Sequence, residues 1–492
     1  MQIQRKQNEF QAYYTDAEEL NNLMIALLGD AKNGNVLEPC AGKGAFVYPL
    51  LKCAKRIDAM DVDLKQILEL QKIRSSNLKI FHGDFIDHFV SDRNESYITT
   101  DYDAIICNPP YGLKWSVDYR KKIKAAFPKL YARESYGLFM IFGISCLRAD
   151  GRFVFIVPDT FLTSHNHTPL RHYLANETTI SHIIQFNSSR FETVNYGYGN
   201  MCIIAGNRHP KKLGNTYWSD MRKNLKPIEM KTFLDVTSIP FKSLSESYKN
   251  GWTNPYTKSS PFTGETITLG EVAECRTGIY TGDNSKFCAY DAENPPKRIN
   301  GHPIDWHNKV RKKNLSEQEK KNGIESGKSY VSFIRGGHRL PYEVTQSAID
   351  WSKEAVEFYR KNKKSRLQNS GFYFQRGLAV PMVTSGKISA SLFYDAIFDQ
   401  GVVGIFPRQS NMLCFLLVYL NSEQATEIKM SINPSANNSA NYLKRIEIPK
   451  PTEKQLRMAN LICEQWSCDD SLDTKKCREI ATKFIKNQFV TI

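Results

Sequence analysis

Residues 102–111 read Tyr102-Asp103-Ala104-Ile105-Ile106-Cys107-Asn108-Pro109-Pro110-Tyr111. The first six form a short apolar run, which predicts a strand buried on both faces of a parallel sheet. The two prolines end that strand, because neither has an N–H group to continue a ladder. Asn108 and Tyr111 are therefore expected at fixed positions beyond the carboxyl end of the strand. Open α/β sheets bind their ligands at that edge.

A corner of this kind suits chemistry at a weakly nucleophilic nitrogen. An exocyclic amine on an aromatic ring has its lone pair delocalised into the ring. The side-chain oxygen of Asn108 and the carbonyl of Pro109 can accept its two N–H groups and return electron density to the nitrogen. Tyr111 can stack on the flat face of the same ring. The tetrapeptide alone also fits a rigid Pro-Pro turn with a capping Asn, so its context decides.

A strand, a glycine loop and a helix are predicted upstream of this corner, over residues 35–46, which read NVLEPCAGKGAF. Gly42 and Gly44 allow the backbone to approach a ligand closely, although such a loop is also compatible with a simple tight turn. The next strand ends in Asp61 and Asp63, about 20 residues after the glycines, a spacing suited to a carboxylate that holds ribose hydroxyls. One of these acids can instead cap the following helix, and we expect the two to divide these roles.

A third strand leads to Gly83-Asp84-Phe85, where a carboxylate can accept from an adenine amine while the phenyl ring packs against the base. Further elements continue the alternation of strands and helices: helices within 10–30 and 134–149, and strands at 151–157, 180–186 and 201–205. This order predicts a mostly parallel α/β sheet through about residue 205.

Length and charge suggest a second part with a different partner. With 492 residues, of which 41% are hydrophobic, the chain predicts two or three globular domains. Residues 207–260 are polar and contain four prolines, so we place a boundary near residue 240. The net charge of +15 is divided into +1 over residues 1–200 and +14 over the rest. That asymmetry favours a polyanion bound mainly by the second part, the alternative being a basic surface that serves solubility.

The cysteines and the apolar runs argue against metal and membrane functions. Eleven cysteines are scattered without any Cys-x-x-Cys pair, which predicts small core residues in a reducing cytosol and no metal site. The amino terminus is polar and has no secretion signal. The longest apolar run, 412–420, is too short to span a bilayer. We therefore expect a cytoplasmic protein.

Taken together, these elements resemble the S-adenosylmethionine-dependent N6-adenine DNA methyltransferases of the gamma class. The resemblance rests on VLEPCAGKGAF paired with NPPY, with GDF between them, and it covers roughly residues 10–206. It implies an α/β fold with a Rossmann-like, mostly parallel methyltransferase sheet in residues 1–240 and a mixed α+β DNA target-recognition domain in 241–492. Two further stretches resemble the opening and closing segments of recognition domains, the second of the kind found in restriction-system specificity subunits: Thr268–Ile279 with Thr281–Asn284, and Asn433–Ser435 with Tyr442–Lys444 and Ile448–Pro451.

The resemblance also implies roles for individual residues. The implied cofactor-binding set is Thr15 (next to Tyr14) at the methionine end, Glu38, Ala41, Gly42 and Gly44 at the amino-acid portion, Asp61 at the ribose, Asp84 and Phe85 at the adenine, and Pro110. Asn108, Pro109 and Tyr111 are implied as the catalytic set. Phe191 is implied to close over the other face of the base, with Tyr196 or Tyr198 as alternatives. The family often has proline where this chain has Asp16, next to Thr15.

The activity implied is a site-specific transfer of a methyl group from S-adenosylmethionine to N6 of an adenine that has been flipped out of double-stranded DNA. Flipping is required because N6 is paired and stacked inside the helix. Such an enzyme serves a restriction-modification system, with a separate cognate endonuclease as a candidate partner, or acts as an orphan methylase. Two alternatives stay open: an RNA adenine or protein glutamine methyltransferase with the same NPPY chemistry, and a DNA-binding specificity module with a vestigial methylase domain. The intact Asn108–Tyr111 corner argues against the second.

Overall fold

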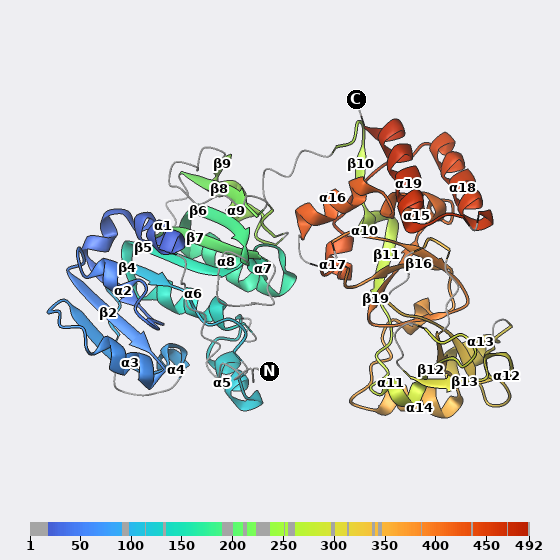
Figure 1. Ribbon diagram of the computed structural model, residues 1–492, viewed down its shortest axis with the longest axis horizontal. Coiled ribbons are helices and arrows are strands. Elements are labelled where there is room, and N and C mark those ends of the chain that lie inside the picture. The colour runs from blue at the N-terminus through green and yellow to red at the C-terminus, as the bar shows by residue number, and fades with distance from the viewer. Residues whose placement is uncertain are drawn as a thin grey trace, which may run out of the picture. The chain divides into compact units, whose positions relative to one another are not determined.

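The computed structural model divides the chain into two compact units, residues 1–256 and 257–492 (Figure 1). One hydrophobic core lies in the first unit, and two cores lie in the second. The structure describes residues 18–90, 98–113, 115–130, 134–188, 200–209, 214–222, 237–249, 251–253, 261–296, 301–311, 314–336, 340–342, 347–384, 386–433, 436–469 and 471–490.

Unit 1 is built on a nine-stranded sheet with the order β3-β2-β1-β4-β5-β7-β6-β8-β9. Its strands are β1 Asn35–Glu38, β2 Arg56–Asp61, β3 Leu78–His82, β4 Tyr102–Cys107, β5 Leu147–Pro158, β6 Thr178–Asn187, β7 Asn200–Arg208, β8 Asn215–Met221 and β9 Thr237–Pro240. Neighbours from β3 to β5 are parallel, as are β6 and β8, whereas β7 and β9 run antiparallel to their neighbours. The predicted mostly parallel sheet is confirmed.

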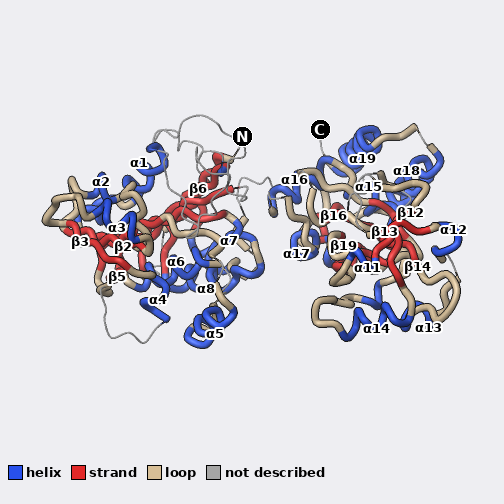
Figure 2. Tube along the Cα trace, turned by 60° about the horizontal axis from the view of Figure 1, so that its bottom comes forward, coloured by secondary structure: helices blue, strands red, loops and turns tan. Residues whose placement is uncertain are grey.

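Helices cover both faces of this sheet. They are α1 Glu18–Leu27, α2 Val47–Leu50, α3 Leu64–Leu70, α4 Phe85–Val90, α5 Val117–Ala126, α6 Ser135–Ser145, α7 Thr160–Thr163, α8 Thr168–Glu177 and α9 Phe241–Glu246. Figure 2 shows α1 and α2 on one side of the sheet and α4, α6 and α8 on the other. The first ten residues of α6 are all buried, so this helix is enclosed by neighbours all round.

The strand order places the predicted corner at the switch point of the sheet. β1 pairs with β2 on one side and with β4 on the other, so the chain winds outward in both directions from these two strands. The loops that follow β1 and β4 therefore leave the sheet side by side at its carboxyl edge. Doubly wound sheets bind ligands at this position.

The boundary between the units lies further along the chain than predicted. β9 pairs with β8, and its last residue, Pro240, lies opposite Asn215. Phe241 of α9 and Trp252 are buried in the core of unit 1, and the Trp252 indole N–H donates to the Leu244 carbonyl at 2.7 Å. The segment predicted as a polar linker thus supplies two strands and a helix of unit 1. The units separate after Tyr256, not at residue 240.

Unit 2 contains three sheets, and their pairing is mixed. The strands are β10 Thr266–Thr268, β11 Ala273–Thr277, β12 Cys288–Asp291, β13 His302–Ile304, β14 Tyr330–Ile334, β15 Ser347–Asp350, β16 Gly377–Pro381, β17 Ser391–Phe393, β18 Ile397–Phe398, β19 Val402–Pro407 and β20 Glu447–Pro449. The sheets have the orders β10-β20, β11-β19-β16-β17 and β13-β12-β15-β14-β18. β12–β13 and β14–β18 are parallel and the other pairs antiparallel, which agrees with the mixed architecture predicted.

One helix of unit 2, α15, is strongly apolar. The helices of this unit are α10 Leu269–Val272, α11 Asn284–Phe287, α12 Trp306–Lys309, α13 Glu317–Asn322, α14 Lys353–Lys361, α15 Met412–Leu420, α16 Glu423–Ile432, α17 Ala440–Leu443, α18 Glu453–Cys468 and α19 Thr474–Phe489. The apolar run 412–420 is α15, which packs against α16, α18 and α19 and is core. Within the described ranges, no helix is both long and apolar enough to cross a membrane.

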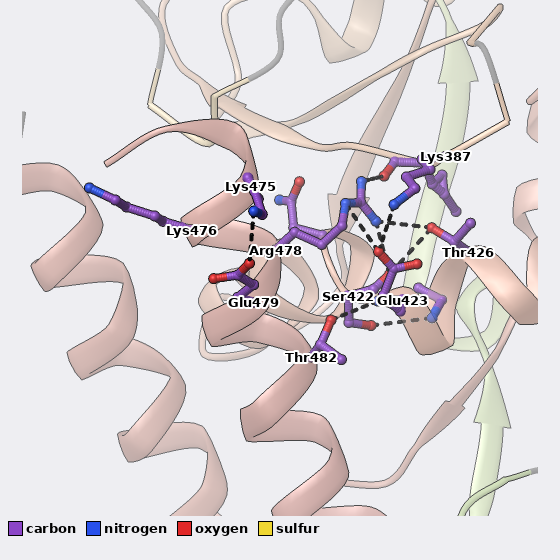
Figure 3. A network of polar contacts seen from close by, with 12 residues as sticks. Lys387, Ser422, Glu423, Thr426, Lys475, Lys476, Arg478, Glu479 and Thr482 are labelled. Atoms are coloured by element: carbon purple, nitrogen blue, oxygen red, sulfur yellow. Dashed lines mark hydrogen bonds and ion pairs between the residues drawn. The ribbon is translucent and has the colours of Figure 1, made fainter. Parts of the chain in front are cut away.

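Buried polar contacts fasten α19 to the start of α16 (Figure 3). The Arg478 guanidinium donates to the Ser422 carbonyl at 3.3 Å and to the Thr426 hydroxyl at 3.1 Å. Glu423 lies between Arg478 and Lys387, whose ammonium is 2.9 Å from the Glu423 carboxylate. These groups are satisfied within the fold, so we assign them to stability.

Unit 2 also joins its first and last described segments. β10 pairs with β20, with Thr266 opposite Pro449. The Thr263 backbone N–H and hydroxyl both donate to the Phe489 carbonyl, at 2.7 and 3.1 Å. The chain therefore enters unit 2 beside the end of its last helix.

Candidate functional site

The glycine loop after β1 is held by a carboxylate at the end of the neighbouring strand β2. Asp61 accepts from the Gly42 N–H at 2.7 Å through one oxygen and from the Asp63 N–H at 2.8 Å through the other. Gly42 and Gly44 have φ of +50° and +83°, in the left-handed region that glycine adopts without strain. Asp61 thus shapes the loop. Each of its oxygens keeps a further lone pair for a ligand.

Glu38, the last residue of β1, is a second acid beside this loop. Its side chain is buried, and among the described residues one of its carboxylate oxygens, Oε2, has no hydrogen-bond partner. Burial, and then the charge of Asp61, raise the pKa of Glu38 well above its ordinary value. A buried carboxylate oxygen without a partner is costly unless something pairs with it. A cationic ligand group placed against the loop would supply that partner.

Of the two acids at the end of β2, Asp63 takes the predicted capping role, and the ribose role of Asp61 stays a prediction. The Asp63 carboxylate accepts from the Lys65 N–H at 2.9 Å and caps α3. Asp61 is left facing the loop. Asp84 resembles Asp63, because its Oδ1 accepts from the Ile86 N–H at 2.8 Å at the start of α4. Burial raises the pKa of Asp84, although the backbone N–H groups oppose that effect.

Phe85 packs differently from its predicted contact with an adenine. Its ring is 1% exposed and stacks on Phe139 of α6, with centroids 5.3 Å apart. Phe89 meets the same ring edge-on. Phe85 therefore belongs to the packing between α4 and α6, and no face of it is open in this conformation. Contact with a cofactor adenine stays a prediction that requires this packing to open.

The Asn108 corner is held at its backbone from two sides. The Cys40 thiol, in the loop after β1, donates to the Asn108 carbonyl at 3.1 Å. The Ser135 hydroxyl at the start of α6 donates to the Pro110 carbonyl at 2.5 Å. Cys40 also lies against Cys107, with the two sulfurs 2.9 Å apart, and burial raises the pKa of both thiols. The glycine loop and the predicted catalytic corner are therefore in direct contact.

Tyr111 turns its ring into the core. Its hydroxyl donates to the Ile156 carbonyl at 2.7 Å and also contacts the Asn108 side-chain oxygen. The ring is fully buried and lies edge-on to Tyr136, whose own hydroxyl is 2.8 Å from a ring nitrogen of His167. The predicted stacking of Tyr111 on a base requires a ring face that this conformation buries. Contact with Asn108 through the hydroxyl was not foreseen.

A model of the Eco57I restriction-modification methylase family matches residues 50–191, a stretch that contains β2 to β6 and the Asn108–Tyr111 corner. Over these residues the chain is similar to that family. The methyltransferase resemblance is thereby confirmed, while the gamma class and the role of NPPY stay predictions. Glu38 and the glycine loop lie before the matched residues.

Curated relatives support the same assignment. The type II methyltransferases M.HincII and M.HindII of Haemophilus influenzae are each 30% identical over 238 residues, which is 46% of this chain and 41% and 39% of those proteins. M.VspI from a Vibrio species is 22% identical over 321 residues, 58% of this chain and 68% of that protein. The matched stretch thus spans about two fifths of the first two relatives.

Two solved structures share the fold over nearly the whole chain. The type IIL restriction-modification enzyme MmeI, in complex with DNA, has a TM-score of 0.51 at 12% identity, covering 96% of this chain and 72% of that one. The DrdV–DNA complex has a TM-score of 0.52 at 12% identity, covering 92% and 57%. At this identity the likeness establishes the fold.

Asp159 lies within the matched residues 50–191 and was not predicted from the sequence as a site residue. It directly follows β5, and its carboxylate accepts from the Gln185 amide at 3.0 Å. Gln185 in turn accepts from the Trp218 indole N–H at 3.0 Å. Burial raises the pKa of Asp159 to about 6, and Arg222 opposes that rise. The signal was present in the sequence, since Asp159 follows a predicted strand at its carboxyl end just as Asn108 does.

We expect Asp159→Asn to stabilise the protein at pH 8 and to have little effect at pH 4. An acid with a raised pKa in the folded state binds its proton more tightly there than in the unfolded chain. Stability is therefore lost as pH rises from about 4 to 6, and removing the charge should recover roughly 1–3 kcal/mol above that window. Melting temperatures between pH 4 and 8 would measure this. Equal destabilisation of the variant at both pH values would contradict the buried-charge interpretation.

The two stretches that resembled a recognition domain meet in unit 2. The Leu269 N–H donates to the Ile446 carbonyl at 2.8 Å, and the Gly270 N–H to the Lys444 carbonyl at 2.9 Å. Gly278 lies where a Cβ atom would come within 1.7 Å of the Phe398 carbonyl oxygen, so only glycine fits that crossing. Much of this motif therefore has a packing reason.

Several predicted residues lie outside the described residues: Thr15, Phe191, Tyr196 and Tyr198. Their roles at the cofactor and the target base stay predictions. Across the part of the chain that the structure describes, no group of three or more His, Cys, Asp or Glu side chains is arranged to hold a metal ion.

Proposed function

We propose that this chain is an S-adenosylmethionine-dependent DNA methyltransferase that modifies N6 of an adenine flipped out of the duplex. The observation that carries the proposal is the contact between the glycine loop and the Asn108 corner, where the Cys40 thiol lies 3.1 Å from the Asn108 carbonyl oxygen. A group transfer requires donor and acceptor sites to adjoin in this way. The Eco57I match over residues 50–191 and the relatives named as type II methyltransferases support the same chemistry.

The residues of the glycine loop fit the cofactor. Glu38 offers a buried carboxylate oxygen that has no partner in the part of the chain that the structure describes, which suits the ammonium of the methionine portion. Asp61 keeps acceptor capacity beyond the two N–H groups that it binds, which suits the ribose hydroxyls. S-adenosylmethionine would supply an electrophilic methyl group on a sulfonium. Binding of a cation would favour the ionised form of both acids, whose pKa values burial raises.

The corner after β4 would prepare the acceptor. The Asn108 side-chain oxygen and the Pro109 carbonyl would accept the two hydrogens of N6, so that electron density returns to the nitrogen as the bond to carbon forms. The base must first leave the helix, where N6 is paired. Phe191, Tyr196 or Tyr198 would close over the base, and Tyr111 would hold it or orient Asn108.

We expect Tyr111→Phe to slow methylation by roughly 3- to 10-fold, the kinetic equivalent of about one hydrogen bond to the Asn108 oxygen. DNA affinity should be unchanged, because the ring remains. Single-turnover rates with saturating cofactor would test this. Tyr173→Phe is a matched control, since that hydroxyl donates at 3.2 Å to the Ile141 carbonyl away from the corner. If Tyr111→Phe and Tyr173→Phe slowed methylation equally, the loss of rate would reflect lower protein stability and not the contact with Asn108.

DNA is the proposed substrate in preference to RNA or a protein glutamine. The +14 charge of residues 201–492 suits a polyanion, and the fold is that of MmeI, which was solved in complex with DNA. The Asn108–Tyr111 corner and the Glu38 oxygen without a partner argue against a vestigial methylase domain. The relatives' restriction-modification context supports a separate cognate endonuclease as a partner.

The proposal can be tested by incubating the purified chain with labelled S-adenosylmethionine and double-stranded DNA, single-stranded DNA, RNA or a glutamine-containing peptide. Single-molecule sequencing of the DNA would locate methylated adenines. We expect methylation of double-stranded DNA at one recurrent site. Methyl transfer to RNA or peptide but not to DNA would show that DNA is not the substrate. If the chain bound no cofactor at all, the whole proposal would be overturned.

A further inference from the structure

Three separate segments of unit 2 meet at one exposed corner. The backbones of Tyr280 and Arg366 bond to each other in both directions, at 3.1 and 2.8 Å. The Gln400 N–H donates to the Ile279 carbonyl at 2.9 Å. The recognition-like stretch around Tyr280 is thereby joined to the basic run 361–366 and to the loop after β18.

Arg366 is presented at this corner in a fixed pose. Its side chain is exposed, and its guanidinium carbon lies 5.3 Å from the centroid of the Tyr280 ring. The guanidinium also contacts the Gln400 side-chain oxygen at 3.4 Å. Among the described residues, no carboxylate forms an ion pair with Arg366. Its remaining N–H donors face solvent.

Two lysines stand beside it on an anchored turn. Lys363 and Lys364 are exposed, and neither forms an ion pair with a described residue, whereas Lys361 pairs with Glu357 at 2.5 Å. The Ser365 hydroxyl fastens the turn to the Tyr359 carbonyl at 2.9 Å.

The nearby acids do not neutralise this charge directly. The Asp399 carboxylate accepts from the Gln400 N–H at 2.8 Å, and Asp283 accepts from the Lys286 N–H at 3.1 Å. Asp399 therefore helps to orient the loop that carries Gln400. The corner combines free cations with a rigid backbone, the arrangement that a specific polyanion contact requires.

We infer that this corner contacts the DNA target site: Arg366, stacked on Tyr280 and tied to Gln400, reads a guanine, and Lys363 and Lys364 bind phosphates. A guanidinium has paired donors that match O6 and N7 of guanine in the major groove, the commonest specific contact to a base. Lysines on the adjacent turn fix register without reading sequence. The inference rests on the proposed function and deepens it, since it names the residues that determine the site.

The test uses the full chain and a library of randomised double-stranded DNA. Methylated adenines are located by single-molecule sequencing for the wild type, Arg366→Ala, Arg366→Lys and the double variant Lys363→Ala/Lys364→Ala. Lys475→Ala/Lys476→Ala is the matched control, because these exposed lysines lie on α19, a helix that packs into the core around α15 (Figure 3). Melting temperature and cofactor affinity are measured for every variant.

We expect the wild type to require a guanine at one position of its site. Arg366→Ala should reduce the preference for guanine at that position by about 10-fold or more and leave the base preferences at the other positions unchanged. Arg366→Lys should reduce the same preference, because lysine lacks the paired donors. The double lysine variant should lower the affinity for all DNA sequences equally. It should also reduce the salt dependence of binding by about two ion equivalents. The control should change neither.

An unchanged sequence profile in both Arg366 variants would overturn the inference, as would a uniform loss across all sequences. Because Arg366→Lys keeps the charge and most of the packing, it decides the matter if the alanine variant fails to fold. A wild type that binds cofactor but methylates no DNA would instead overturn the proposed function. The two failures are therefore distinguishable.

Discussion

Asn108→Ala should lower the rate of methyl transfer by two or more powers of ten, by analogy with the loss of one hydrogen bond made to the transition state. Positive charge develops on the amine as the new bond forms, and the Asn108 oxygen is the acceptor placed to stabilise it. DNA and cofactor affinity should change little. Single-turnover rates at saturating DNA and cofactor measure the chemical step directly.

The control for this substitution is Asn176→Ala on α8, where an exposed side chain donates to the His172 carbonyl of its own helix, at 2.8 Å. That variant should behave like the wild type. If Asn108→Ala retained a near-normal rate on every nucleic acid tried, the catalytic assignment would fail. NPPY would then be a rigid turn that the Cys40 and Ser135 hydrogen bonds hold in place.

Asp61→Ala should weaken S-adenosylmethionine binding by about 100-fold or more. Hydrogen bonds to a charged group contribute roughly 1.5–3 kcal/mol each, and a carboxylate that bridges two ribose hydroxyls loses both. The variant also removes the acceptor of the Gly42 N–H, which donates to the Asp61 carboxylate at 2.7 Å. Isothermal titration of the full chain with S-adenosylmethionine gives the affinity.

Asp63→Ala is the matched control, because Asp63 caps α3 and its loss should cost about 1 kcal/mol of stability with unchanged cofactor affinity. A cofactor analogue without the 2′-hydroxyl separates ribose binding from loop shaping. The wild type should discriminate against it, and Asp61→Ala should not. If Asp61→Ala bound S-adenosylmethionine with unchanged affinity, another acid would have to bind the ribose.

Local sequence predicted the parts of the fold in which a short apolar run forms a buried strand and the next residues end that strand. Asn108 and Asp63 each follow such a strand, so their places at its carboxyl edge could be predicted from neighbouring residues. β8 was missed because its residues alternate between buried and exposed, so the segment reads as polar. Trp252 was missed because nothing close to it in sequence predicts its burial in a distant core.

Side-chain packing was beyond local prediction. Phe85 stacks on Phe139, which comes from a helix beyond β4, so its burial depends on how α4 and α6 meet. The contact of Tyr111 with Ile156 requires the pairing of β4 with β5. Tyr280, Arg366 and Gln400 lie far apart in sequence, and only the tertiary structure shows that they form one corner.

The hydrogen bonds from Thr263 to Phe489, and the pairing of β10 with β20, bring the entry and the exit of unit 2 to one place. A segment whose ends adjoin can be cut out and replaced without stretching what lies before it. Recombination between relatives at these two points would exchange the whole cassette as a piece, leaving Asp61 and Asn108 untouched. If unit 2 holds the residues that recognise the target site, as proposed, such an exchange would change the sequence specificity and leave the residues of the chemical step in place.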